Sequence, residues 1–186
     1  MTTSPGYTLF DTALGPCALV WSERGLKGLW LPETTLEATR ARVLRRFPDA
    51  IEAPPPSEVV AAIAAIAALL RGEPSDLAEV SLDLDAVPEF EQRVYAAARA
   101  IPPGRVVTYG ELAATLGEAG AAQAVGRALA RNPFPIVVPC HRIVAAGDRL
   151  HGFSAPGGLA TKRRLLEIEG GRRRDQPDLF DPPGQA

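Results

Sequence analysis

Short apolar runs separated by turn residues fill the first part of the chain, a pattern typical of β structure. Three strands are predicted, over residues 7–10, 17–21 and 26–31. Leu14-Gly15-Pro16 and Gly25 lie between them and suit two tight turns. A further edge strand is expected over residues 81–84, where apolar and acidic side chains alternate. The pattern favours a small antiparallel sheet.

Two segments of the same half have helical periodicity. Residues 34–47 place Leu36, Val43 and Leu44 on one side and arginines elsewhere. A second helix is predicted over residues 59–70, with Ser57 as its N-cap. Residues 1–85 are therefore expected to form an α/β domain that combines the small sheet with helices.

Beyond residue 87 the pattern becomes helical. Residues 89–101 form an amphipathic segment. Thr108 is expected to cap a short helix over residues 109–116, and Glu111 completes a capping box. A third helix follows over residues 121–131. Two short helices joined by a glycine-containing turn match the helix-turn-helix pattern.

A cysteine follows this helical region at the end of an apolar run. The β-branched residues 136–138 are predicted to form a buried strand, and Pro139 stops it. Cys140 and His141 come next, so a thiol stands on a rigid turn beside a candidate base. No other stretch of the chain combines a nucleophile, a base and a rigid mount.

The chain is expected to divide into two domains and a tail. Residues 86–170 form a mostly α-helical, winged-helix-like domain that contains the helix-turn-helix and the cysteine. A glycine-rich loop over residues 151–158 and a helix over residues 159–169 complete it. Residues 171–186 are polar and proline-rich and are predicted to form a flexible tail.

Composition excludes several classes of protein. No apolar run approaches the roughly 20 residues of a membrane helix, and no signal peptide is expected. Two cysteines far apart, Cys17 and Cys140, do not suggest a disulfide framework. Two histidines, His141 and His151, provide no familiar zinc pattern. These features favour a cytoplasmic protein without metal or cofactor.

The net charge of −2 hides a segregation of charge. Residues 1–90 hold seven Lys and Arg against thirteen Asp and Glu, whereas residues 91–164 hold ten against four. A basic second half suits a DNA-binding surface, although chance segregation of solvated charge is about as good an explanation when taken alone.

The chemistry of the Cys140 stretch has several interpretations. A cysteine attacks as the thiolate, so an adjacent base raises its reactivity, and a third group usually orients such a histidine. Glu167 and Glu169 on the last helix are both candidates. Alternatives are a buried inert thiol, a thiol hydrolase that turns over, and a non-catalytic DNA binder or regulator.

Several motifs together resemble the O6-alkylguanine-DNA alkyltransferases, also called methylated-DNA–protein-cysteine methyltransferases. They are Asn132-Pro133, the run 136–138, Pro139-Cys140-His141-Arg142, Phe153-Ser154 with Gly157-Gly158, and Leu165-Leu166 through Glu169-Gly170. The strong resemblance covers residues 90–170, and residues 1–85 fit the N-terminal domain of the family loosely.

The resemblance implies a single, irreversible transfer of an alkyl group from O6-alkylguanine, or O4-alkylthymine, in double-stranded DNA to Cys140. It implies a monomer that binds the minor groove with its helix-turn-helix and flips the damaged base. Cys140 would be the nucleophile, His141 its base through a water, and Glu169 the group that orients His141.

The remaining roles also come from the resemblance. Asn132 would brace the turn, and Tyr109 would donate a proton or hydrogen bond to the leaving guanine. The residues implied to bind the substrate base are Leu129, Ile143, Phe153, Ser154 and Gly157. Those implied to bind DNA are Tyr109, Gly110, Gln123, Ala124, Gly126, Arg127 and Arg131.

Three features depart from the usual family pattern. Gln123 stands where an arginine usually fills the gap left by the flipped base, and Phe153 stands where tyrosine is usual. Ala155-Pro156 lengthens the loop. These changes bear on base flipping and on pocket width, and none alters the nucleophile.

The tail contains a second motif. Gln176, Leu179 and Phe180 resemble the Gln-x-x-Leu-Phe pentapeptides with which bacterial repair proteins dock on the sliding clamp. A chance Leu-Phe pair in a flexible tail is an equally good explanation.

Overall fold

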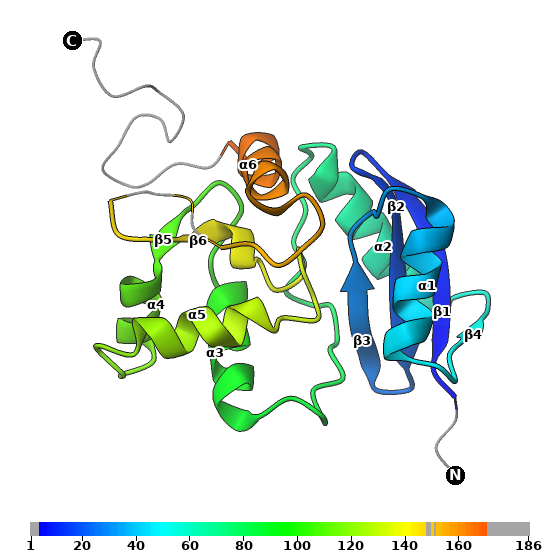
Figure 1. The fold of residues 1–186 in the computed structure, drawn as a ribbon, viewed down its shortest axis with the longest axis horizontal. Coiled ribbons are helices and arrows are strands. Elements are labelled where there is room, and N and C mark those ends of the chain that lie inside the picture. The colour runs from blue at the N-terminus through cyan, green and yellow to red at the C-terminus, as the bar shows by residue number, and fades with distance from the viewer. Residues whose placement is uncertain (1–3, 148–149, 151, 171–186) are drawn as a thin grey trace.

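A four-stranded sheet with one helix on each face organises the N-terminal half (Figure 1). The structure is a computed structural model and describes residues 4–147, 150 and 152–170. The strand order is β3-β2-β1-β4; β1, β2 and β3 are antiparallel, and β4 joins β1 in parallel. The elements of this half are β1 (Gly6–Thr12), β2 (Gly15–Ser22), β3 (Gly25–Trp30), α1 (Leu36–Arg46), β4 (Ile51–Glu52) and α2 (Ser57–Leu70).

Strand β2 is buried on both faces, because α1 covers one face of the sheet and α2 the other. Cys17, Leu19 and Trp21 enter the larger core that α2 closes. Ala18 and Val20 point to the opposite face and pack with Val43 of α1 in a smaller cluster. The alternation follows from the two-residue period of a strand.

The three predicted strands and both helices of this half are present, with differences in detail. Gly15 and Pro16 belong to β2, and the turn consists of Ala13 and Leu14, so the first two strands are longer than predicted. Ser57 is the first helical residue rather than the N-cap, which is Pro56 without a side-chain bond. A backbone that is already helical at Ser57 does not present its hydroxyl as a cap.

The predicted edge strand over residues 81–84 is reduced to one parallel bridge between Leu26 and Leu82. Leu26 donates its N–H to the carbonyl of Ser81 and accepts from the N–H of Asp83, at 2.9 and 2.7 Å. The short β4 was not predicted, because its two residues are both exposed and have no apolar pattern.

The second half is mostly helical and contains one two-stranded parallel sheet, in which β5 pairs with β6. Thr108 caps α4 with the predicted capping box to Glu111. The elements are α3 (Glu89–Arg99), β5 (Val107–Thr108), α4 (Tyr109–Thr115), α5 (Ala122–Ala130), a 3-10 helix (Cys140–Arg142), β6 (Ile143–Val144) and α6 (Gly158–Ile168). In Figure 1, α3, α4 and α5 lie on the side opposite the large sheet, and α6 lies against the 3-10 helix.

The prediction of a strand over residues 136–138 is wrong. These residues form a buried turn in which Val138 donates its N–H to the carbonyl of Phe134 at 2.7 Å. Ile136 has a φ of 74°, a left-handed conformation that a β-branched residue rarely adopts. Ile136 and Val138 are 1% and 0% exposed, so burial explains their apolar character; among the described residues, the only pairing of this run is an isolated bridge from Val138 to Pro135 within the turn.

The two halves share one hydrophobic core. Ile66 of α2, Val94 of α3 and Leu165 of α6 belong to the same buried cluster. The outer edge of β3 also holds the second half, because Leu29 donates its N–H to the carbonyl of Pro133 at 2.8 Å. This bond docks the segment before Cys140 directly onto the large sheet.

Within the described part of the chain, no helix is long and apolar enough to cross a membrane. The predicted tail, with the clamp motif at Gln176, Leu179 and Phe180, lies outside the described residues.

Candidate active site

Cys140 opens a 3-10 helix that follows directly from the buried turn. Its N–H donates to the carbonyl of Val138 at 2.8 Å, and the N–H of Arg142 donates to the carbonyl of Pro139 at 2.9 Å. Proline at 139 fixes φ just before the thiol. Successive short-range bonds therefore hold the thiol on a tight turn, as expected, although the element before it is not a strand.

Asn132 ties this turn together. Its amide nitrogen donates to the carbonyl of Val138, and its amide oxygen accepts from the N–H of Phe134, both at 2.9 Å. The same side chain lowers the pKa of the Cys140 thiol and so favours the thiolate. One asparagine thus links the end of α5, the buried turn and the thiol.

His141 and Glu169 meet in the interior. His141 Nε2 lies 2.9 Å from Glu169 Oε1, and their side chains are 0% and 3% exposed. Arg142 donates from Nε and Nη2 to the same carboxylate at 2.9 and 2.8 Å, and from Nη1 to the carbonyl of Ile101. Glu167, the other candidate for orienting His141, is exposed, and its Oε2 lies 3.8 Å from Nη1 of Arg164.

The second nitrogen of the histidine is left unpaired. Nδ1 of His141 is buried and has no hydrogen-bond partner among the described protein atoms. A buried polar atom without a partner is unusual, and it commonly marks a functional group or a water position. Since Nε2 faces Glu169, Nδ1 is the nitrogen available to exchange a proton.

The ionisation states follow from burial and from these contacts. Burial raises the pKa of the Cys140 thiol, an effect that Asn132 and the charge of Lys162 only partly offset. Burial lowers the pKa of His141 below 6.5, although Glu169 opposes this. Burial alone would raise the pKa of Glu169, but its bonds from His141 and Arg142 lower it to about 2. The resting site at neutral pH is a thiol beside a neutral imidazole and an ionised carboxylate.

Tyr109 approaches the site from the first turn of α4. Burial raises its pKa, and the charge of Cys140 adds to the effect, so the phenol keeps its proton at neutral pH. Its ring lies against α5, because a Cβ added at Gly126 would sit 3.8 Å from a ring carbon. The small residue at 126 thereby gives Tyr109 its position.

Lys162 is a site residue that sequence analysis missed. Its side chain is 0% exposed and donates from Nζ to the carbonyl of Ile143 at 2.6 Å. Nζ also lies 5.9 Å from the centre of the Tyr109 ring. Burial lowers the pKa of Lys162 to about 8, although the charge of Cys140 opposes the shift. A lysine in an amphipathic helix gives no sign of burial, so only the fold reveals it.

Cys140 lines a cavity of about 910 Å³, which we call the thiol cavity. Phe153, Ser154 and Asn132 also line it. Of the other residues predicted to bind the substrate base, Leu129 and Ile143 are buried in the core and Gly157 caps α6. These three and Tyr109 are not among the residues that line this cavity.

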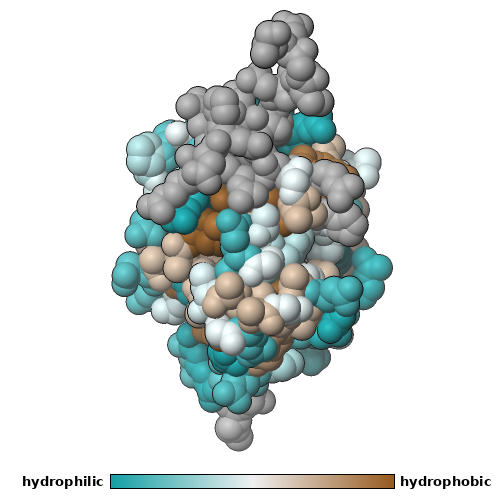
Figure 2. All heavy atoms as spheres, turned by 90° about the vertical axis from the view of Figure 1, so that its left-hand side faces the viewer, coloured by the Kyte–Doolittle hydropathy of each residue, from teal (hydrophilic) through white to brown (hydrophobic). Residues whose placement is uncertain are grey.

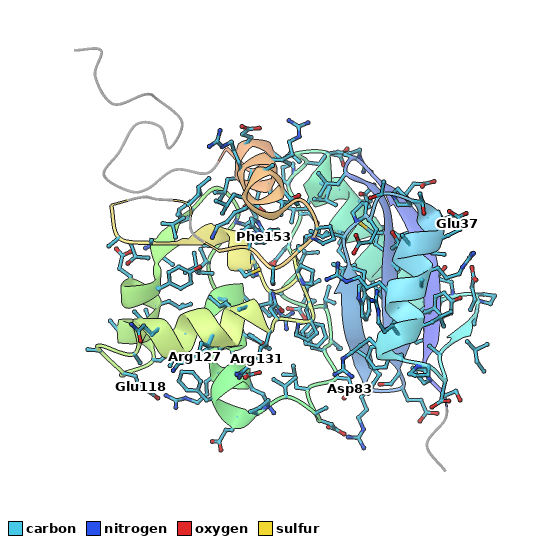
Figure 3. All side chains as sticks on the ribbon, in the orientation of Figure 1. Glu37, Asp83, Glu118, Arg127, Arg131 and Phe153 are labelled. Carbon is cyan, nitrogen blue, oxygen red and sulfur yellow. The ribbon has the colours of Figure 1, made fainter. Side chains whose placement is uncertain are left out.

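The predicted DNA-binding residues lie on or beside α4 and α5. Gly110, Gln123, Arg127 and Arg131 are exposed, and Ala124 is half-buried. Figure 2 shows the side of the molecule that carries these helices; its middle is mostly pale or tan, and hydrophilic residues lie around it. Arg127 and Arg131 follow one another along α5 toward the site (Figure 3). Small residues therefore occupy the middle of the face that α4 and α5 form, and arginines lie along α5.

Among the described residues, no group of three or more His, Cys, Asp or Glu is arranged to hold a metal ion. The arrangement provides instead a nucleophile, a neutral base, an oriented carboxylate and a phenolic proton donor. Such a set can support a displacement at carbon by sulfur.

Comparisons with known proteins agree with this chemistry. Residues 89–171 match the family model described as the DNA-binding domain of 6-O-methylguanine DNA methyltransferase. A methylated-DNA–protein-cysteine methyltransferase from Mycobacterium tuberculosis is 37% identical over 175 residues, which cover 94% of this chain and 98% of that protein.

Solved structures show the same similarity to methyltransferases of this kind. The crystal structure of Mycobacterium tuberculosis O6-methylguanine methyltransferase has a TM-score of 0.71 and 36% identity, and the match covers 95% of this chain and 99% of that chain. A structure of Mycobacterium tuberculosis OGT in complex with DNA has a TM-score of 0.71 and 35% identity with the same coverage.

Proposed function

The chain belongs to the methylated-DNA–protein-cysteine methyltransferase family, and we propose that it repairs O6-alkylguanine in DNA by moving the alkyl group onto Cys140 in a single, irreversible step. Alkyl transfer in DNA repair is the activity of the family. The observation that carries the assignment to Cys140 is its position on the turn that Asn132 holds, directly before His141 of the buried His141–Glu169 pair.

The proposed reaction is a displacement at the alkyl carbon. Nδ1 of His141 takes the thiol proton through a water, and Sγ of Cys140 attacks the carbon. The bond from that carbon to O6 breaks as the bond to sulfur forms, and guanine leaves as the anion. Tyr109 supplies a proton to guanine and regains one from solvent. The ionised Glu169 stabilises the imidazolium that forms on His141.

Irreversibility follows from the bond that is made. A thioether has no good leaving group, so the alkyl group stays on the sulfur. Each protein molecule is therefore expected to act once. The same reasoning extends to O4-alkylthymine, whose alkyl carbon is also bonded to an exocyclic oxygen of the base.

Recognition of DNA is proposed to use the face of α4 and α5. Small residues such as Ala124 and Gly126 allow close approach to a groove, and Arg127 supplies charge for phosphates. Arg131 is also proposed to contact the DNA, although its charge is paired with Glu91. The target base would flip out of the duplex, since its O6 is otherwise inside the stack. Gln123 would hydrogen-bond the orphaned cytosine without adding charge. The Mycobacterium tuberculosis relative in complex with DNA supports this role.

A stoichiometry assay tests the proposed function. A fluorescent O6-benzylguanine substrate should label one equivalent of protein in a single burst and then stop. Continued turnover would indicate a thiol hydrolase, and an absence of labelling would indicate a binder or regulator. The Cys140→Ala variant should lose labelling and still bind DNA that contains O6-methylguanine.

Further predictions extend to the organisation of the protein. The division at residues 85/86, the monomeric state and the cytoplasmic location stay predictions; the family match that begins at residue 89 supports the boundary. Docking of Gln176, Leu179 and Phe180 on a sliding clamp is also a proposal. A pull-down with purified clamp that survives Leu179→Ala with Phe180→Ala would contradict it.

A further inference from the structure

The thiol cavity extends well beyond the space that a methyl group needs. Its lining includes Cys140, Phe153 and Pro135, and it extends to the N-terminal half, where Arg45 and Arg46 of α1 belong to the lining. Figure 3 labels three of its lining residues: Phe153 lies on one side, and Arg131 and Asp83 lie on the other. The bond from Leu29 to Pro133 holds the two halves together along this route.

The lining combines apolar and basic segments. The loop that contains Phe153 also contributes Ala155 and Pro156, which are apolar. Trp30 and Phe47 also line the cavity, and their rings meet edge to face with centres 5.9 Å apart. A hydrocarbon chain that leaves the thiol would therefore lie against apolar and aromatic surface.

The part of the lining that α1 supplies is basic and consists of Arg42, Arg45 and Arg46. Three cations in the lining are neutralised by carboxylates that also line it: Lys27 by Asp83, Arg131 by Glu91 and Arg42 by Glu33. Arg45 and Arg46 line the cavity as well, and among the described residues neither forms an ion pair with a carboxylate. Arg46 lies 5.2 Å from the centre of the Phe47 ring, which helps to hold it in place.

We propose that the thiol cavity accommodates long O6 substituents of guanine and prefers those that end in a carboxylate, which Arg45 and Arg46 bind. The inference rests on the proposed function and extends its substrate class. The bond changes are those of methyl transfer: the carbon next to O6 forms a bond to Sγ, its bond to O6 breaks, and the whole substituent remains on Cys140. The thiol proton passes to His141, and guanine takes a proton from Tyr109.

The test compares three free-base guanines by intact mass over time: O6-methylguanine, O6-hexylguanine and O6-(5-carboxypentyl)guanine. The last two have similar length and differ in terminal charge. At low salt the wild type should transfer the carboxypentyl group faster than the hexyl group by about threefold to tenfold, as expected for exposed charge pairs. Added salt should reduce the ratio.

Two variants on the same helix identify the cause. Arg45→Ala with Arg46→Ala should bring the carboxypentyl-to-hexyl ratio close to one and leave methyl transfer unchanged. Arg40→Ala is the matched control, because Arg40 is on α1, pairs with Glu52 and does not line the cavity. It should keep the wild-type ratio.

The outcomes separate the two proposals. Equal carboxypentyl and hexyl rates in the wild type, or a ratio that survives the double arginine variant, would overturn the inference while methyl transfer continues. A protein that transfers none of the three groups, and no methyl from a duplex, would overturn the proposed function instead.

Discussion

The two cysteines differ in the neighbouring side chains that can accept or donate a proton. Cys17 is fully buried on β2 in the core beneath α2, and the only hydrogen-bonding contact of its thiol among the described residues is Thr12 Oγ1 at 3.6 Å. Cys140 is partly exposed on a cavity and stands beside Asn132 and the His141–Glu169 pair. Burial raises the pKa of both thiols, that of Cys17 to about 11.

The comparison teaches that a thiol pKa does not identify a nucleophile. Both thiols are protonated at neutral pH, so neither is reactive as it rests. Only Cys140 has a neutral base in the neighbouring residue and a carboxylate that can stabilise the charged base. Reactivity in this chain depends on the neighbours that accept the proton and on access from the cavity.

The strongest way to break the comparison is to remove each thiol in turn. Cys140→Ala should abolish alkyl transfer, since Cys140 is the only thiol among the described residues that line the thiol cavity. Cys17→Ala should leave the rate unchanged and lower the free energy of unfolding by about 1 kcal/mol through lost packing. Transfer rates and urea unfolding of both variants measure this. Residual transfer in Cys140→Ala, or a dead Cys17→Ala that is folded, would contradict the contrast.

The next largest effect should come from the proton acceptors. His141→Gln and Glu169→Gln should each slow transfer by about 10²-fold to 10³-fold, as general-base catalysis contributes. Glu169→Gln should also lower the free energy of unfolding by about 3 kcal/mol, because it leaves Arg142 buried without its partner. Rates are therefore measured well below the unfolding temperature of each variant.

Glu167→Gln is the control for Glu169. Glu167 is on the same helix, is exposed, and lies near Arg164 alone. Its substitution should change neither the rate nor the stability noticeably. A loss in Glu167→Gln as large as that in Glu169→Gln would point to general destabilisation of α6 rather than to proton transfer.

The pH dependence should sharpen the same contrast. Because the pKa of His141 is lowered below 6.5, the folded protein takes up that proton only at a more acidic pH than a free imidazole does. The base therefore stays neutral as the pH falls to 6.5, and the transfer rate should change by less than about twofold between pH 7.5 and pH 6.5. A rate that already halves above pH 6.5 would mean that another group controls the thiol.

The smallest expected effect is that of a substitution on α5, away from the thiol. Gln123→Arg should speed transfer from duplex DNA by about threefold and leave transfer from single strands unchanged, since an arginine would fill the gap left by the flipped base. Equal acceleration on both substrates would reject a role in flipping and indicate general electrostatic attraction.

Parts of this site could be predicted from sequence because the signals are local. The Thr108–Glu111 capping box and the two helices after it depend on neighbouring residues, and the structure confirms them. The meeting of His141 and Glu169 was expected only through the family resemblance, since 28 residues separate them. The local sequence pattern alone does not distinguish Glu169 from Glu167 as the partner of His141.

Other parts could not be predicted because tertiary packing decides them. The apolar run 136–138 suggests a strand, yet it is apolar because it is a buried turn with Ile136 in a left-handed conformation. Lys162 gives no sign of its burial beside Tyr109. The approach of Arg45 to the cavity of Cys140 joins two segments far apart in the chain.

The central claim is that Cys140 alone accepts the alkyl group. The most direct test incubates the protein with a duplex that contains O6-methylguanine, weighs the intact protein and then maps the modified peptide. A gain equal to one methyl group, located on Cys140 with Cys17 unmodified and reaching one equivalent per molecule, is the predicted result. No gain in mass, or a methyl group on any other residue, would contradict the account.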